Sequence, residues 1–328
     1  MSLHGLFIGF VLLGVSATPD TSSVSPVWPP PPDRPRVRHV RTIASGADLQ
    51  PVGGVLDGVL GLLFGERDAR PWLVQPVGIA VSASGLLAVA DPGIHGVHLI
   101  DPGEQTYRLL TETETGVLQS PVGVAFDTRE FLYVSDSERG CVAVFDEDGD
   151  PEFMIKDGLN RPTGLLVAHD TLYVVDTGSH RIVRFDAKGR FLAASGTRGK
   201  AGGEFNFPIQ LAGGDTLFVV DALNYRVQRL TPSGEYLSAF GSQGNGLGTF
   251  AGPKAIARDS EGHLYVTDAL LDNVQVFDCA GRLVLVVGRQ GNADGEFMSP
   301  TGIAIDRNDR IYIVDALNRR IQVLQYLQ

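Results

Sequence analysis

The sequence predicts an all-β fold: a six-bladed β-propeller of four-stranded antiparallel blades, closed by an N-terminal strand. Three observations lead to this prediction. A unit of about 45 residues recurs six times, each unit encodes short strands and turns, and the sixth unit ends one strand short. Repeats of this length with four strands each are typical of propeller blades.

Each unit opens with a proline, usually as Pro-x-Gly, and its second strand ends in an aspartate that follows the proline by 13 to 15 residues. Consecutive prolines are 41 to 47 residues apart. The opening prolines are Pro76, Pro121, Pro162, Pro208, Pro253 and Pro300. The closing aspartates are Asp91, Asp136, Asp176, Asp221, Asp268 and Asp315. This regularity predicts six blades over residues 73–328.

The fifth unit shows how the strands are encoded. Apolar runs at 255–259, 264–268, 274–277 and 283–287 are separated by turns rich in Gly and Asp. Short runs of β-branched and aromatic residues between such turns predict half-buried strands. Each unit therefore supplies four strands.

The last unit lacks its fourth strand, because the chain ends soon after the third strand at 321–324. An unpaired sheet edge is a liability for a soluble protein. Residues 36–44 alternate polar and apolar side chains before the first repeat. We therefore predict that this segment pairs beside 321–324 and closes the ring.

The region before the closing strand predicts export. Residues 5–15 are apolar and glycine-rich, and Ala17 follows in a small-residue site. This run is too short to cross a bilayer and suits a secretory signal peptide over 1–17. We therefore expect a periplasmic or secreted, extracytoplasmic location and no membrane span.

Two further segments flank the closing strand. Residues 18–35 contain Trp28 followed by four prolines, which predicts an extended polyproline linker. Residues 52–64 carry apolar side chains at helical spacing and predict a short helical insert. That helix could pack on the propeller or dock a partner or membrane.

Two repeats carry a family resemblance. Residues 221–228 and 315–322 both read Asp-Ala-Leu-Asn-x-Arg-x-Gln, and the linkers 241–250 and 288–297 match each other. On these motifs the chain resembles the NHL-repeat family of six-bladed propellers, in particular its exported bacterial members. The resemblance covers residues 73–328 and implies the fold, whereas fold alone does not imply function.

One enzyme class with NHL-like repeats can be tested on the same alignment. Zinc-dependent peptidylamidoglycolate lyases place a metal-binding His directly after the opening proline in alternate blades. The corresponding residues here are Val77, Val122, Thr163, Ile209, Lys254 and Thr301. None is a His, so the resemblance does not carry that activity to this chain.

The composition restricts the partners. Acidic residues number 38 and basic residues 27, for a net charge of −11, which argues against nucleic acid as the main partner.

Cys141 and Cys279 fall in the second and fifth repeats, on opposite sides of the predicted ring. We therefore expect no bridge between them, and a monomer stabilised by its core.

A candidate ligand site breaks the repeat. Pro208 is followed by Ile209 and Gln210, and Pro253 by Lys254 and Ala255, where other units have x-Gly. With Arg161, which precedes Pro162, Gln210 and Lys254 could form a locally positive channel mouth for a small anion or an acidic peptide terminus. Simple divergence of the repeat is the alternative interpretation.

A second candidate uses the position four residues after each closing aspartate. It holds His95, Gly140, His180, Tyr225, Asp272 and Arg319. Alternate blades give His95, His180 and Asp272, residue types that bind metals. The alternative is a polar loop rim, in which Tyr225 and Arg319 would contact a partner.

The closing aspartates are interpreted as structural, because Arg181, Arg226 and Arg320 follow three of them by five residues and can pair with the carboxylates. No Gly-x-Ser-x-Gly elbow or other complete catalytic set occurs. The sequence thus favours a non-catalytic extracytoplasmic scaffold, without a cofactor, that presents its faces to a protein or peptide partner. A metal-dependent lyase or hydrolase at the channel mouth is the alternative.

Overall fold

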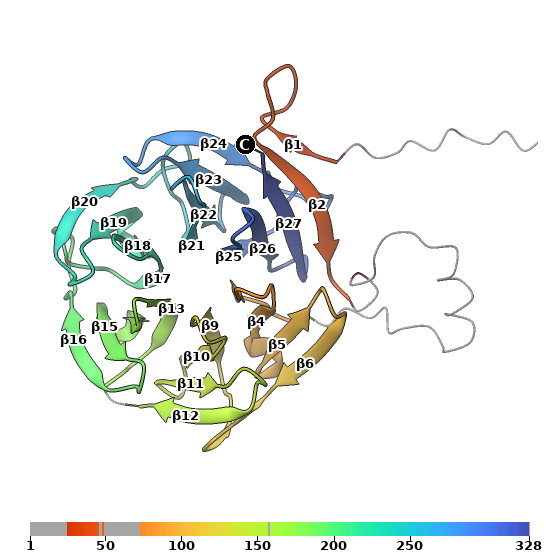
Figure 1. Ribbon diagram of the computed structural model, residues 1–328. Coiled ribbons are helices and arrows are strands. Elements are labelled where there is room, and N and C mark those ends of the chain that lie inside the picture. The colour runs from red at the N-terminus through yellow and green to blue at the C-terminus, as the bar shows by residue number, and fades with distance from the viewer. Residues whose placement is uncertain (1–24, 46–47, 49–72, 157, 328) are drawn as a thin grey trace, which may run out of the picture.

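The described residues of the computed structural model are 25–45, 48, 73–156 and 158–327. They form a ring of six blades around a central axis, as predicted (Figure 1). The predicted signal peptide at 1–17 and helical insert at 52–64 lie outside the described residues. Within the described residues, no helix has the length and apolarity needed to cross a membrane.

Each blade is an antiparallel sheet whose first strand lines the axis. Blade 1 contains β3 (Gly78–Val81), β4 (Leu87–Asp91), β5 (Gly96–Asp101) and β6 (Thr106–Leu110). Blade 2 contains β9 (Pro121–Phe126), β10 (Leu132–Asp136), β11 (Cys141–Phe145) and β12 (Pro151–Ile155). Blade 3 contains β13 (Pro162–Ala168), β14 (Thr171–Asp176), β15 (Arg181–Asp186) and β16 (Phe191–Ser195).

The second half of the ring repeats this order. Blade 4 contains β17 (Pro208–Gly213), β18 (Leu217–Asp221), β19 (Arg226–Leu230) and β20 (Tyr236–Phe240). Blade 5 contains β21 (Pro253–Arg258), β22 (Leu264–Asp268), β23 (Asn273–Phe277) and β24 (Leu283–Val287). Blade 6 contains β25 (Pro300–Ile305), β26 (Arg310–Asp315) and β27 (Arg320–Tyr326) from the C-terminus.

The N-terminal strand completes blade 6 and confirms the predicted closure. β2 (Val37–Ile43) pairs antiparallel with β27, from Val37 opposite Tyr326 to Ile43 opposite Ile321 (Figure 1). Val37 and Ile43 are each only 1% exposed. The two ends of the chain therefore share one sheet and one part of the core.

A second N-terminal strand extends this sheet. β1 (Val27–Trp28) pairs with β2, with Trp28 opposite Val37. The end of the predicted linker 18–35 therefore belongs to the folded ring. Val27 and Trp28 form the outer edge of the sheet, and the prolines follow directly after them. Prolines lack a backbone N–H, but at a sheet edge this removes no hydrogen bond between strands.

The core lies between neighbouring blades. One cluster joins Phe218 and Val220 of blade 4 to Ile256 and Val266 of blade 5, with Phe250 from the linker between them. The equivalent linker side chains Phe205, Phe250 and Phe297 are each at most 1% exposed. Because each interface needs two blades, burial of apolar surface depends on the whole ring.

The closing aspartates anchor the blade openings. All six are fully buried, and Asp176 Oδ1 accepts hydrogen bonds from the backbone N–H of Asn160 and Arg161. The predicted arginine pairs are confirmed, with Nε–Oδ2 distances of 3.0 Å for Arg181–Asp176, 2.8 Å for Arg226–Asp221 and 2.7 Å for Arg320–Asp315. These carboxylates therefore act structurally and hold the segment that enters the channel.

Candidate binding site at the channel mouth

A cavity of about 340 Å³ opens where the innermost strands begin. Two rings of residues form its wall. The residues directly after the opening prolines are Val77, Val122, Thr163, Ile209, Lys254 and Thr301. The residues after those are Gly78, Gly123, Gly164, Gln210, Ala255 and Gly302. Every blade therefore contributes two neighbouring positions to the mouth.

The close approach of neighbouring strands explains the glycines of the second ring. A Cβ on Gly78 would lie 2.1 Å from the Val122 carbonyl oxygen, and one on Gly123 would lie 1.9 Å from that of Thr163. A side chain at either place would push adjacent blades apart. The Pro-x-Gly pattern thus reflects packing around the axis, and Gln210 stands where four other blades have glycine.

The structure brings Arg161, Gln210 and Lys254 into this one cavity, as the sequence predicted. Arg161 and Lys254 are exposed, and their cationic groups have no partner among the described residues. Gln210 Oε1 accepts from the backbone N–H of Leu211 at 3.0 Å, and its amide nitrogen has no hydrogen bond within the described part of the chain. Three sets of free donors therefore face the mouth.

A fourth donor was missed by sequence reasoning. Thr301 lines the cavity, and its hydroxyl is buried without a hydrogen-bond partner among the described residues. Buried polar atoms are usually satisfied, so such an atom points to a missing partner. Thr301 directly follows the opening proline Pro300, and this position is the only signal for it in the sequence.

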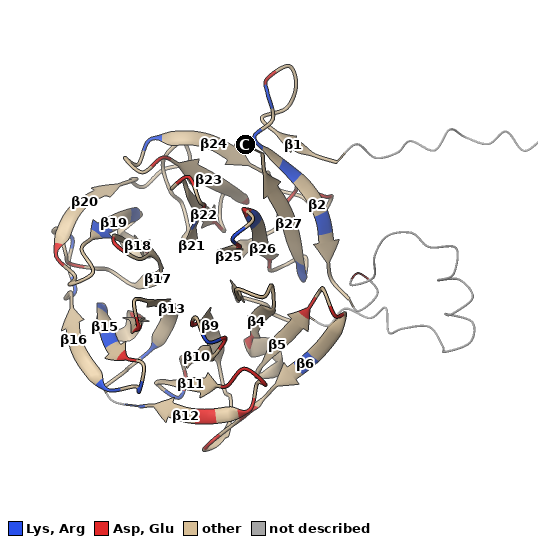
Figure 2. Cartoon of the chain, viewed as in Figure 1, with Lys and Arg blue, Asp and Glu red and all other residues tan. Residues whose placement is uncertain are grey.

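The charge of the mouth differs from that of the chain. Its lining contains Arg161 and Lys254 and, among the described residues, no Asp or Glu. Basic and acidic residues are interspersed around the ring in Figure 2, so this positive charge is local. A recessed site of one sign concentrates ligands of the opposite sign. The mouth is therefore suited to an anion.

The six positions four residues after the closing aspartates share one backbone conformation. Their φ angles lie between 50° and 61°, in the left-handed region. In alternate blades the side chain reaches the opening of the next blade: His180 Nδ1 accepts from Phe207 N at 3.1 Å, and Asp272 Oδ1 accepts from Ser299 N at 2.7 Å. His95 also reaches the opening of the next blade, but there its Nδ1 donates to the Gln119 carbonyl oxygen.

The structure therefore does not bring His95, His180 and Asp272 together. No group of three or more His, Cys, Asp or Glu side chains within the described residues could hold a metal ion. The physical reason is that each of the three side chains bonds the loop of its neighbouring blade. Tyr225 is half-buried against the core between blades 4 and 5, Arg319 is exposed, and neither lines the mouth.

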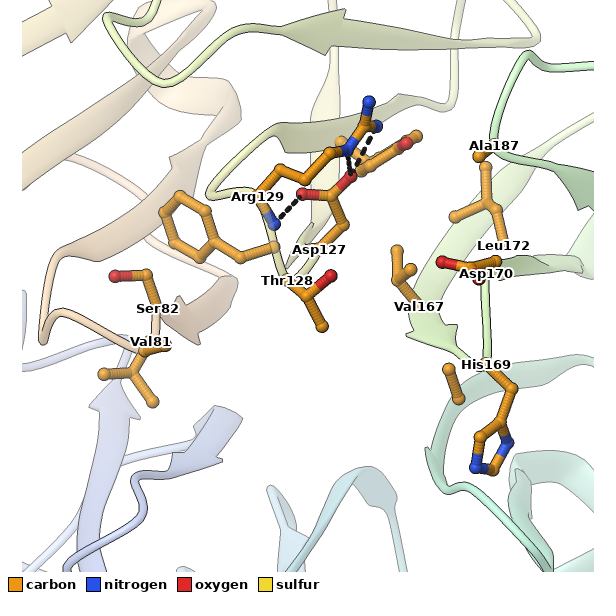
Figure 3. Close-up of a pocket in the computed structure, with 14 residues that line it drawn as sticks. Val81, Ser82, Asp127, Thr128, Arg129, Val167, His169, Asp170, Leu172 and Ala187 are labelled. Atoms are coloured by element: carbon orange, nitrogen blue, oxygen red, sulfur yellow. Dashed lines mark hydrogen bonds and ion pairs between the residues drawn. The ribbon is translucent and has the colours of Figure 1, made fainter.

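The opposite face carries a smaller cavity of about 210 Å³, between the first turns of blades 1, 2 and 3 (Figure 3). Its Asp127 carboxylate accepts from Arg129 Nε at 3.1 Å and Nη2 at 2.7 Å. The Asp127 side chain also accepts from the backbone N–H of Arg129 and Phe131. Because this ion pair satisfies both charges internally, the mouth is a better candidate site than this cavity.

Two family models match parts of the chain. The NHL repeat model matches residues 118–145, which cover blade 2, and a family described as a 6-bladed beta-propeller matches residues 255–326. Together with the six observed blades, these matches agree with the fold expected from the sequence. The chain is a six-bladed β-propeller that contains an NHL repeat. Comparison of the chain with curated protein sequences finds no match.

Solved structures with diverse activities share the fold. A gluconolactonase from Xanthomonas campestris is 18% identical with a TM-score of 0.62, covering 90% of this chain and 99% of that one. An auxiliary nutrient binding protein from Bacteroides thetaiotaomicron is 13% identical with a TM-score of 0.63, covering 78% and 70%. A virginiamycin B lyase from Staphylococcus aureus is 14% identical with a TM-score of 0.53, covering 77% and 95%. At these identities the likeness shows the fold alone.

Proposed function

We propose that this NHL propeller is a non-catalytic binding scaffold whose channel mouth holds a carboxylate of a protein or peptide partner. One observation carries the proposal: Arg161, Lys254 and Gln210 converge on a cavity that no described acidic residue lines. A guanidinium binds a carboxylate through two parallel hydrogen bonds, and an ammonium adds a compact charge. The donors therefore match this ligand group.

The size of the cavity supports a group carried on a chain. At about 340 Å³ the mouth lies near the lower end of the range of small-molecule pockets, roughly 300–1,000 Å³. It can receive a side chain or chain end, while the rest of the partner stays outside. A face of loops around such a pocket suits a partner that reaches in from above.

The alternative of a metal-dependent lyase or hydrolase has less support. The described residues that line the mouth include no His, Cys, Asp or Glu. These residue types supply the ligands of catalytic zinc sites and the usual general bases. An enzyme at this place would need groups that the described mouth does not offer, so we favour binding.

The test compares peptides with a free and an amidated C-terminal carboxylate, using the full chain and the variant Arg161→Gln/Lys254→Gln. Fluorescence anisotropy should show weaker binding of the free-acid peptides to this variant, by about tenfold or more, because hydrogen bonds to charged groups are each worth roughly 1.5–3 kcal/mol. The matched control is Lys188→Gln/Arg307→Gln, which removes two exposed cations that lie outside the mouth. Equal affinities of the mouth variant and the control would contradict the proposal.

We also propose that the protein works outside the cytoplasm. The apolar run at 5–15, followed by Ala17, supports this. N-terminal sequencing of protein recovered from the producing cells should find a mature chain that begins near Thr18. Intact chains that all start at Met1 would contradict export.

A further inference from the structure

Three exposed leucines occupy equivalent loop positions in adjacent blades. Leu223, Leu270 and Leu317 each lie two residues after the closing aspartate of blades 4, 5 and 6, and are 50%, 72% and 67% exposed. Most large apolar side chains of the blades are buried. We call these three residues the leucine rim. In blades 1–3 the same position holds Gly93, Glu138 and Gly178.

The loops hold the leucine rim in its exposed position. The Leu223 N–H donates to the Asn206 carbonyl at 3.0 Å, and the Leu317 N–H donates to that of Met298 at 3.2 Å. The Leu270 N–H donates to Asp268 Oδ1 at 3.1 Å. Because the backbone of each loop is tied to its own blade, binding need not order these residues first, which lowers the entropic cost of association.

In blades 1 and 3 the equivalent loop position leaves no room for a leucine side chain. A Cβ on Gly93 would lie 2.9 Å from the Gln75 Cβ, and one on Gly178 would lie 2.8 Å from Asn160 Nδ2. In blade 2 the position carries the charge of Glu138. The leucines are therefore confined to blades 4–6, because the equivalent position in blades 1–3 holds a glycine or a glutamate.

Two residues of the leucine rim belong to the blades that carry Gln210 and Lys254. In blade 5, Pro253 pairs with Asp268; Lys254 follows Pro253 directly, and Leu270 lies two residues after Asp268. In blade 4, Pro208 pairs with Asp221; Gln210 and Leu223 each lie two residues after one member of this pair. Each leucine therefore follows the strand pair at whose opening end the donor of the same blade lies.

We infer that the partner presents a peptide segment in which a carboxylate is flanked by apolar side chains. The carboxylate enters the mouth, and the apolar side chains lie on the leucine rim. This inference rests on the proposed function and specifies its ligand. Charge complementarity argues for a peptide: Arg161 and Lys254 line a recessed cavity of about 340 Å³, which a carboxylate on a slender chain can enter and a flat membrane surface cannot.

The test begins with selection of short random peptides on the immobilised full chain. Enriched sequences should combine an acidic residue or a free C-terminus with apolar residues next to it. The best peptide is then measured by fluorescence anisotropy against Leu223→Ser/Leu270→Ser/Leu317→Ser. The matched control is Leu192→Ser/Leu237→Ser/Leu247→Ser, which replaces three leucines that are 52%, 51% and 81% exposed elsewhere on the chain.

We expect the rim variant to bind the peptide about tenfold more weakly, with the control within about twofold of the parent, because serine cannot bury the apolar area that each leucine would bury against the peptide. If the mouth variant Arg161→Gln/Lys254→Gln loses binding and the rim variant does not, the inference is wrong and the proposed function stands. If neither variant changes binding, or if no peptide is enriched, both are wrong.

A sedimentation experiment with lipid vesicles distinguishes a membrane partner from a peptide partner. Phosphatidylcholine vesicles containing phosphatidylglycerol are sedimented with the full chain and with the rim variant. Rim-dependent sedimentation without peptide enrichment would overturn the inference in favour of a lipid surface. Peptide enrichment with no sedimentation supports the inference.

Discussion

Blades 4 and 6 contain the same anchor but are assembled differently. In both, a fully buried aspartate pairs with an arginine five residues later, Asp221 with Arg226 at 2.8 Å and Asp315 with Arg320 at 2.7 Å. All four strands of blade 4 lie within one continuous stretch, whereas blade 6 takes its outer strand β2 from the N-terminal region. The anchor is therefore a local property of the repeat, while blade 6 also depends on association of the two chain ends.

Removing the borrowed strand should have the largest effect. Deleting residues 36–44 exposes the edge of β27 and the side chains packed against Val37 and Ile43. Burial of each such side chain is worth about 1.5–3 kcal/mol, so the melting temperature should fall by roughly 10 °C. Differential scanning calorimetry measures it. A chain that begins at Arg36 keeps β2 and serves as the control. Equal melting of the deletion and this control would refute closure.

If each Asp–Arg anchor is a local property of its repeat, the anchors of blades 4 and 6 should contribute equally to the unfolding free energy. Asp221→Asn and Asp315→Asn each remove the partner of a half-buried arginine and weaken the bonds from Gln228 and Gln322. Each should cost about 3 kcal/mol, because breaking a buried pair leaves one charge uncompensated. Urea unfolding measures both variants. A cost in blade 6 that exceeds that in blade 4 by more than about 1 kcal/mol would show that the anchor and the closure are coupled.

The short strand β1 should contribute less. Trp28 pairs with Val37 and packs against the cluster that contains Phe297, at the outer edge of blade 6. Trp28→Ala should lower the unfolding free energy by about 1–2 kcal/mol, since the side chain is only partly buried. Chemical denaturation gives the value. The matched replacement in blade 4 is Tyr236→Ala, on the exposed outer strand β20, which should cost less.

In blade 1 the equivalent anchor makes the stability of the fold depend on pH. Its buried Asp91 pairs with His98, at an Nε2–Oδ2 distance of 3.3 Å, where blades 4 and 6 have a glutamine. Burial disfavours the charged carboxylate, but hydrogen bonds from His98 and from the backbone of Val74 and Gln75 outweigh it and hold the pKa of Asp91 below its usual value. The ionised Asp91 therefore stabilises the fold above its unfolded pKa, and this contribution is lost as pH falls through the folded pKa.

His98→Gln tests this assignment and should have the smallest effect. Glutamine keeps a hydrogen bond to the carboxylate but removes the histidine contribution, so the pKa of Asp91 should be lowered less. The melting temperature should then fall less between neutral and acidic pH than in the parent. An unchanged pH profile would show that other carboxylates govern acid unfolding.

The repeat pattern allowed three of the site residues to be predicted from the sequence. Gln210 and Ala255 replace the glycine of Pro-x-Gly, which points to Gln210 and to the neighbouring Lys254, and Arg161 directly precedes an opening proline. Thr301 was overlooked, since whether its hydroxyl has a partner depends on neighbours distant in sequence. The leucine rim also lay in the recurring Asp-Ala-Leu segments, but a leucine in a loop motif does not reveal its exposure.

The sequence by itself determined the number of blades, the opening prolines and the closing aspartates, because each is a local pattern that recurs at a nearly fixed interval. It also determined the borrowed strand, because the last repeat lacks its fourth strand and residues 36–44 have the alternation of a strand. Only the tertiary structure decided which side chains meet. It turned His95, His180 and Asp272 toward neighbouring loops, buried the Thr301 hydroxyl without a partner among the described residues, and placed Val27–Trp28 in the closing sheet. The physical reason is that the direction of a side chain depends on backbone φ and on the adjacent blade, and neither is a property of a single repeat.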